Sequence, residues 1–125
     1  AFVQQTSIDL FAPAVGNIHG IVKSGQPKLS INRIKALAEV LYREPSRAAL
    51  VLHGGSGSSD EEFVQAVKAG VVIIHINTDL RVLYRDTLKQ TLDTTQEATP
   101  YKFLAPSVAA MQHYVAQKIK LFAGQ

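Results

Sequence analysis

The chain alternates short apolar runs with longer amphipathic stretches. Three runs of almost entirely apolar residues lie at positions 8–15, 48–52 and 71–76. Continuous apolar runs of this length are typical of strands that are buried on both faces of a parallel sheet. The pattern therefore predicts three parallel strands.

Amphipathic stretches fill the segments between these runs and the segment after the last one. The stretch after Ser59 begins with a capping-box pattern, because Glu62 follows the serine by three residues, and we expect it to stop at Gly70. Pro106 stands near the first turn that we expect for the last stretch. Apolar residues at helical spacing predict four helices, at residues 31–41, 60–69, 80–88 and 108–122.

The resulting order of strands and helices is the βα alternation of a parallel α/β fold. An open doubly wound sheet and a (β/α)8 barrel both have this alternation, and three strands are too few for either. A barrel takes about 250 residues, so 125 residues would supply its last three strands and its closing helices. The chain also opens in what looks like the tail of a helix. We therefore expect residues 1–125 to form one partial domain, the carboxyl-terminal part of a longer barrel.

Composition and charge narrow the classes of function. The chain has no cysteine, which excludes a disulfide scaffold and a thiolate metal site and permits a reducing compartment. Its net charge of +3 comes from basic residues spread singly along the chain, so nucleic acid is not an expected partner. No apolar run reaches the roughly 18 residues of a spanning helix, and the opening Ala-Phe-Val-Gln-Gln has neither the basic region nor the apolar core of a signal peptide. We expect a cytoplasmic protein that binds no membrane.

Polar and glycine residues follow each predicted strand. These clusters are Gly16-Asn17-Ile18-His19-Gly20, His53-Gly54-Gly55-Ser56-Gly57 and His75-Ile76-Asn77-Thr78-Asp79. The carboxyl ends of the strands line the active-site face of parallel α/β folds. We therefore expect the three clusters to converge.

His19 and His53 are candidate zinc ligands, because neutral imidazole binds zinc well. A catalytic zinc commonly has three protein ligands, and this pattern offers two. The alternative is that one or both histidines are hydrogen-bonded residues that hold a junction between strand and loop.

The glycines at 54, 55 and 57 would let backbone N–H groups approach an anion, and Ser56 adds a hydroxyl donor. This pattern indicates a phosphate site, with a tight turn that needs positive φ as the alternative. No lysine follows the glycines, so the loop is not a P-loop. In the third cluster, Thr78 or Asp79 is a candidate helix N-cap, and His75 taken alone is more often a core histidine than a catalytic group.

The three clusters together resemble a known enzyme family. The segments AVGNIHG, VLHGGSG and GVVIIHINTDLR, in this order, resemble the carboxyl-terminal half of class II, zinc-dependent fructose-bisphosphate aldolases, and the tail from Tyr101 to the LFAG ending is also similar. The resemblance implies a (β/α)8 barrel that cleaves fructose 1,6-bisphosphate reversibly into dihydroxyacetone phosphate and glyceraldehyde 3-phosphate. It also implies that His19 and His53 are two of three zinc-binding histidines, with zinc as the Lewis acid at the ketone.

The resemblance further implies which residues hold the substrate phosphate, with a monovalent cation, Na⁺ or K⁺, nearby. His75 and Asn77 are departures, because they stand where the family commonly has an Asn-x-Asp pair whose side chains contact substrate. The expected phosphate-binding residues are Gly20, Gly54, Gly55, Ser56, His75, Ile76, Asn77 and Thr78.

The segment contains no expected catalytic residue. The family's first zinc histidine, its catalytic aspartate and its mobile glutamate loop belong to the amino-terminal half, so we expect these 125 residues by themselves to be inactive. An unpaired strand edge should make the segment aggregate or pair with another copy, and we expect the full-length enzyme to be a homodimer. The alternatives are a tagatose-bisphosphate aldolase and a non-catalytic half-barrel that binds sugar phosphates.

Overall fold

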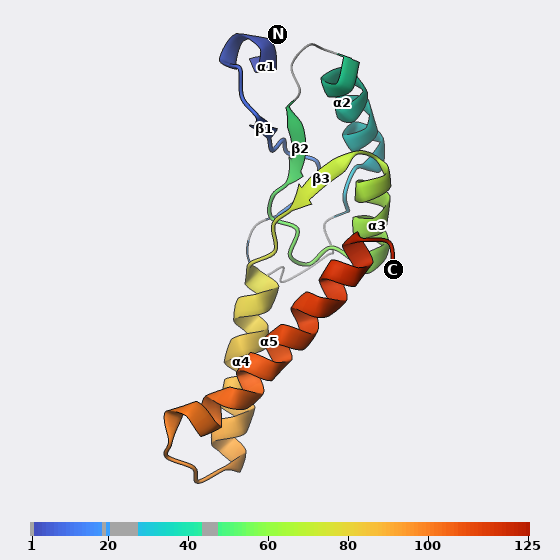
Figure 1. Cartoon of the computed structure of the whole chain (residues 1–125). Coiled ribbons are helices and arrows are strands. Elements are labelled where there is room, and N and C mark those ends of the chain that lie inside the picture. Colours follow the sequence, from blue (N-terminus) through green and yellow to red (C-terminus); the bar gives the residue numbers. More distant parts are fainter. Residues whose placement is uncertain (1, 19, 21–27, 44–47) are drawn as a thin grey trace. The chain divides into compact units, whose positions relative to one another are not determined.

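The computed structural model describes residues 2–18, 20, 28–43 and 48–125 (Figure 1). The chain divides into two compact units, Ala1–Ile76 and Asn77–Gln125. The first unit contains helix α1 (Phe2–Thr6), strand β1 (Leu10–Phe11), helix α2 (Ile31–Arg43), strand β2 (Ala49–Leu52), helix α3 (Asp60–Lys68) and strand β3 (Val71–Ile74). The second unit contains helices α4 (Thr78–Thr94) and α5 (Pro100–Phe122).

The first unit is built on a parallel sheet with the strand order β1-β2-β3, so the prediction of parallel α/β structure is confirmed. Strand β1 covers only two residues of the predicted run at 8–15. The strand cannot continue, because Pro13 has no amide hydrogen and the N–H of Val15 donates to Oδ1 of Asn17 instead of to β2.

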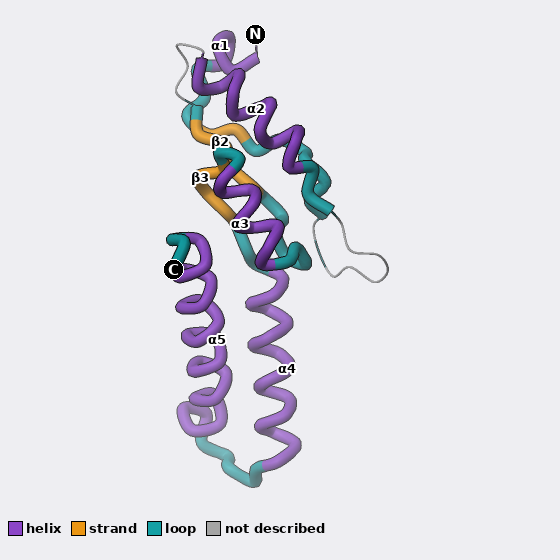
Figure 2. The backbone as a smooth tube through the Cα atoms, turned by 90° about the vertical axis from the view of Figure 1, so that its right-hand side faces the viewer, coloured by secondary structure: helices purple, strands orange, loops and turns teal. Residues whose placement is uncertain are grey.

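Helices α2 and α3 lie on the same side of this sheet (Figures 1 and 2). Their apolar stripes meet the sheet as the helical spacing predicts, and Ile34 of α2 and Phe63 of α3 are completely buried. Leu50 and Leu52 of β2, the central strand, are buried as well. The core of the unit therefore lies between β2 and the two helices.

Helix α3 begins and ends where the sequence predicts. The Ser59 hydroxyl accepts a hydrogen bond from the Glu62 N–H at 3.2 Å, and the Glu62 carboxylate accepts one from the Ser59 N–H at 2.9 Å. At the other end, Gly70 has φ = +114° and turns the chain into β3. This left-handed conformation favours glycine, so the helix is bounded by local signals at both ends.

The second unit is a pair of antiparallel helices that pack against each other (Figure 2). A loop separates them, and α5 begins at Pro100 and not near residue 108. Pro100 occupies the first turn, where the lack of an N–H costs nothing. Pro106 therefore lies inside the helix, and its predicted position in the first turn is wrong. In the described part of the chain, no helix is both long and apolar enough to cross a membrane.

Candidate metal and phosphate site

Strands β2 and β3 bring two of the predicted site histidines together. His53 follows β2 directly, His75 follows β3 directly, and their ring centroids lie 4.8 Å apart in an edge-to-face arrangement with an interplanar angle of 76°. Both side chains are exposed. The convergence of these two strand ends, expected for a parallel sheet, is thus observed within the first unit.

The backbone holds this histidine pair in place. The His75 N–H donates to the Leu52 carbonyl at 2.9 Å, and the Gly55 N–H donates to the His75 carbonyl at 3.3 Å. These two bonds continue the contact between β2 and β3 beyond the residues assigned to the strands. The backbones of the two histidines are therefore held next to one another by the sheet.

The glycine-rich loop after His53 is the tight turn with positive φ that the sequence analysis gave as an alternative. Gly54 has φ = +71° and Gly57 has φ = +87°, so the loop does need glycine for its backbone conformation. Gly55 is required for a different reason, because a Cβ there would lie only 3.0 Å from Cε1 of Phe63. Ser56 is buried, with 4% of its surface exposed. Backbone N–H groups in such a glycine-rich turn can bind an anion. The Gly55 N–H, however, already donates to the His75 carbonyl.

The helix that follows this loop offers little attraction to an anion. The first turn of α3 carries Asp60, Glu61 and Glu62, and its first amides are capped from within by Ser59. Acidic side chains in the first turn already complement the helix dipole. An anion at the glycine loop would therefore be bound by the loop itself.

Asn17 is a site residue to which the sequence analysis assigned no role. Its side-chain Oδ1 accepts a hydrogen bond from the Val15 N–H at 2.8 Å, and its Nδ2 donates to the His53 carbonyl. This one amide ties the loop after β1 to the end of β2. Its position in a polar cluster at a strand end was the only signal for it in the sequence.

The remaining residues of the first cluster are less informative. Gly20 is exposed and has φ = +94°, and no atom of the described residues would lie within 4 Å of an added Cβ. The predicted zinc ligand His19 lies outside the described residues. Ile76 is half-buried and is the last residue of the first unit.

Asn77 and Thr78 open the second unit. Asn77 is the N-cap residue of α4, so the prediction that Thr78 or Asp79 is the cap is wrong, and Thr78 is the first helical residue instead. The Asn77 side chain makes no capping hydrogen bond, while its carbonyl accepts from the Arg81 N–H at 3.1 Å. The first turn of α4 therefore has no side-chain cap on its amide groups.

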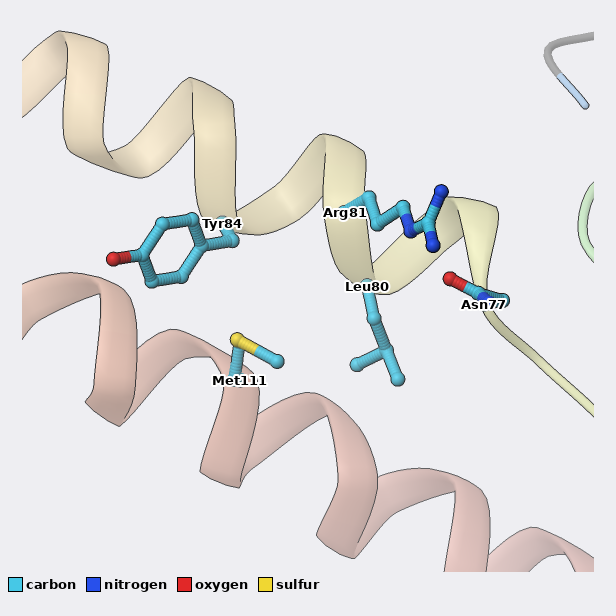
Figure 3. A pocket seen from close by; sticks show the side chains of 5 residues that line it. All are labelled: Asn77, Leu80, Arg81, Tyr84 and Met111. Carbon is cyan, nitrogen blue, oxygen red and sulfur yellow. The ribbon is translucent and has the colours of Figure 1, made fainter.

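A pocket of about 580 Å³ lies beside this helix start (Figure 3). Figure 3 shows Asn77 and the Arg81 guanidinium near one end of it, and Tyr84 and Met111 near the other. Its lining residues are Asn77, Leu80, Arg81, Tyr84 and Met111. Apart from Asn77 and Arg81, this lining is largely apolar.

The two described histidines of the first unit are donors of the type that zinc prefers, but a catalytic zinc commonly has three protein ligands. Imidazole nitrogen is a standard zinc ligand, and His53 is exposed. Within residues 2–18, 20, 28–43 and 48–125, no three or more histidine, aspartate or glutamate side chains gather closely enough to hold one metal ion.

Sequence comparisons identify relatives of the whole chain. The profile of the family "Fructose-bisphosphate aldolase class-II" matches residues 1–125. The chain is 36% identical over 122 residues to the 6-phospho-5-dehydro-2-deoxy-D-gluconate aldolase of Shouchella clausii, covering 97% of this chain and 40% of that protein. It is 31% identical over 131 residues to the fructose-bisphosphate aldolase of Streptococcus pneumoniae, covering 97% of this chain and 43% of that one.

A solved structure gives the same answer. The YdjI aldolase from Escherichia coli K12 superposes with a TM-score of 0.79 at 30% sequence identity, over 97% of this chain and 42% of that one. The chain thus spans less than half the length of the relatives it matches. With the profile match extending over every residue, the chain belongs to the class II fructose-bisphosphate aldolase family.

Proposed function

We propose that this chain forms the metal-binding and phosphate-binding part of an aldolase that cleaves fructose 1,6-bisphosphate reversibly into dihydroxyacetone phosphate and glyceraldehyde 3-phosphate. The observation that carries the proposal is the end of β2, where an exposed imidazole is followed directly by a glycine-rich turn. A metal ligand and an anion-binding loop on one strand end can hold the two polar ends of a small phosphorylated ketone.

His19 and His53 are the residues that would hold zinc in this proposal. Zinc bound there supplies a Lewis acid for the ketone oxygen of the substrate. The sheet fixes the backbone of His53, and Asn17 holds its carbonyl, so the ligand is positioned before a metal arrives.

Phosphate binding is assigned to Gly54, Gly55 and Ser56 in the first unit and to Thr78 in the second, with Gly20 supporting them. The first turn of α4 is uncapped by a side chain, and such amides attract anions. The neighbouring His75, Ile76 and Asn77 complete the set. A monovalent cation, Na⁺ or K⁺, would offset part of the phosphate charge.

The remainder of the active site is also part of the proposal. The relatives are more than twice as long as the matched segment, so the other strands of a (β/α)8 barrel would supply the third zinc ligand and the catalytic aspartate. In that arrangement this segment binds and orients substrate but does not move the proton. The whole enzyme would act as a homodimer in the cytoplasm.

A second substrate class has a specific observation in its favour, the 36% identity to an aldolase for 6-phospho-5-dehydro-2-deoxy-D-gluconate. A molecule of that constitution has a ketone next to a phosphorylated carbon. Cleavage between its C3 and C4 would release the same dihydroxyacetone phosphate, with a carboxylate on the other product. Tagatose 1,6-bisphosphate shares the same ketone end, so the residues described here would serve all three substrates.

The proposal is tested with the complete open reading frame that encodes this chain, loaded with zinc and supplied with each of the three substrates. We expect release of dihydroxyacetone phosphate, its loss in a chelator, and its loss in His53→Asn. Val108→Lys, an exposed change on α5, serves as the matched control and should keep the activity. Binding of dihydroxyacetone phosphate without cleavage of any substrate would overturn the enzyme and favour the sugar-phosphate-binding module.

A further inference from the structure

The pair formed by His53 and His75 has a geometry that goes beyond the expected role of either residue. Two imidazoles that bind one tetrahedral zinc have centroids about 5 Å apart, because each nitrogen lies about 2 Å from the metal and about 1 Å from its ring centre. The observed separation of the two centroids is 4.8 Å, and the rings are not stacked but set edge to face at 76°. The observed separation matches the one expected for two rings that share an ion.

The surroundings of the pair favour the same interpretation. Both rings are exposed, so an ion can reach them from solvent without unfolding any element. Their backbones are held by the hydrogen bonds from His75 to Leu52 and from Gly55 to His75. Side chains whose backbones are already held lose less conformational entropy on binding a metal than side chains on a mobile loop.

From these observations we propose that His75 is a metal ligand and shares one zinc ion with His53. The inference rests on the proposed zinc chemistry and adds a donor from β3 to the ligand set. His75 stands where the family resemblance implies an asparagine, whose amide is a much weaker zinc ligand than imidazole. The metal site of this chain would therefore contain a nitrogen donor that an asparagine could not provide.

A shared ion has a consequence for the substrate end of the site. A histidine bound to the metal is no longer available to donate a hydrogen bond to substrate from the coordinating nitrogen. The change from asparagine to histidine thus moves residue 75 from substrate binding to metal binding.

Zinc affinity of the 125-residue chain tests the inference without any assay of catalysis. Zn²⁺ is titrated against a chromophoric chelator in the unchanged chain, His53→Asn, His75→Asn and His113→Asn. We expect both site variants to lose at least about tenfold in zinc affinity. His113, an exposed histidine of α5, is the matched control, and its variant should bind as the unchanged chain does.

A second readout does not depend on whether the variants fold. In the unchanged chain with ¹⁵N-labelled histidine, Zn²⁺ should shift one ring nitrogen of His75 together with one of His53. Far-UV circular dichroism of each variant separates lost ligation from lost structure, and His75→Gln repeats the test with a longer amide.

The outcomes distinguish this inference from the proposed function. If His75→Asn binds zinc as tightly as the unchanged chain while His53→Asn does not, residue 75 is no ligand and the inference fails, but the proposed metal site stands. If neither substitution weakens binding, both the inference and the proposed zinc site fail. If His75→Asn weakens zinc binding and His53→Asn does not, the two histidines do not share one ion and the inference also fails.

Discussion

The Glu62 carboxylate accepts a hydrogen bond from the backbone N–H of Leu29 at 2.9 Å, across 33 positions of sequence. Its other oxygen accepts from the Ser59 N–H, also at 2.9 Å, and so completes the cap of α3. One side chain therefore caps α3 and holds the segment that leads into α2. A residue that the sequence marks as a helix cap thus also makes a tertiary contact.

The first prediction concerns the stability that this carboxylate provides. Burial raises the pKa of Glu62, but hydrogen bonds from the backbones of Ser59 and Leu29 outweigh burial and hold the pKa below its ordinary value. Because the folded chain has the lower pKa, the stabilisation is present above the unfolded value of 4.5 and is lost as the pH falls through the folded value. We expect Glu62→Gln to reduce the free energy of unfolding by about 1–2 kcal/mol near neutral pH.

Urea denaturation at several pH values, from about 7 down to about 3, measures this dependence. The difference in the free energy of unfolding between the unchanged chain and Glu62→Gln should become smaller as the pH falls below the ordinary pKa of glutamate. Glu61→Gln is the matched control from the same helical turn, since Glu61 is exposed and its side chain accepts a hydrogen bond from the Gln65 side chain at 3.0 Å. A gap of constant size at every pH would contradict the prediction.

A second prediction concerns Gly70, which lies between α3 and β3. A Cβ at this position would lie 2.6 Å from the Cβ of Ala38 on α2, and φ is +114°. Gly70→Ala should therefore destabilise the first unit by about 2 kcal/mol or more, through backbone strain and overpacking together. Gly124→Ala isolates the strain, because φ there is +73° and nothing lies within 4 Å. Thermal unfolding of both variants should show the larger loss at Gly70, and equal losses would exclude the clash.

A third prediction concerns the contact between the two helices of the second unit. The Tyr114 hydroxyl on α5 donates to Oδ2 of Asp79 in the first turn of α4, at 3.1 Å. Tyr114→Phe should cost about 0.5–1.5 kcal/mol and speed amide hydrogen exchange in the first turn of α4. Tyr101→Phe, at a residue 75% exposed, should leave that exchange unchanged. The prediction fails if both variants exchange at the same rate.

A fourth prediction concerns self-association of the chain. In the described part of the sheet, β3 pairs with β2 alone, and Val72 on β3 is 58% exposed. Unpaired strand edges promote pairing between chains, and lysine on such a strand opposes it. We expect concentration-dependent association in sedimentation velocity, reduced in Val72→Lys. Val108→Lys changes an equally exposed valine on α5, and a larger reduction there would assign the association to the helix instead.

The sequence alone predicted those elements whose signals are local. The apolar runs gave two of the three strands nearly to the residue, and the Ser59 and Glu62 pattern gave the start of α3, because capping bonds span only three positions. The chemistry-bearing clusters were also found in the sequence, since polar residues directly after buried strands stand out. The family followed from those clusters and their order.

Other features did not follow from the hydrophobic pattern. The run at 8–15 was too long a prediction for β1, because the bond from Val15 to Asn17 ends the strand early. The start of α5 was misplaced because Pro106 fits a first turn as well as Pro100 does, and only the structure shows which one lies inside the helix.

The sequence by itself determined the parallel α/β character, the capped helix and the identity of the residues at the strand ends, because apolar period and capping chemistry act within a few residues. Tertiary structure decided that His53 and His75 lie 4.8 Å apart, that Asn17 holds the His53 carbonyl, and that Glu62 reaches Leu29. Those distances come from the register of β2 against β3 and from the packing of α2 beside α3. No pattern within one segment encodes the register between two.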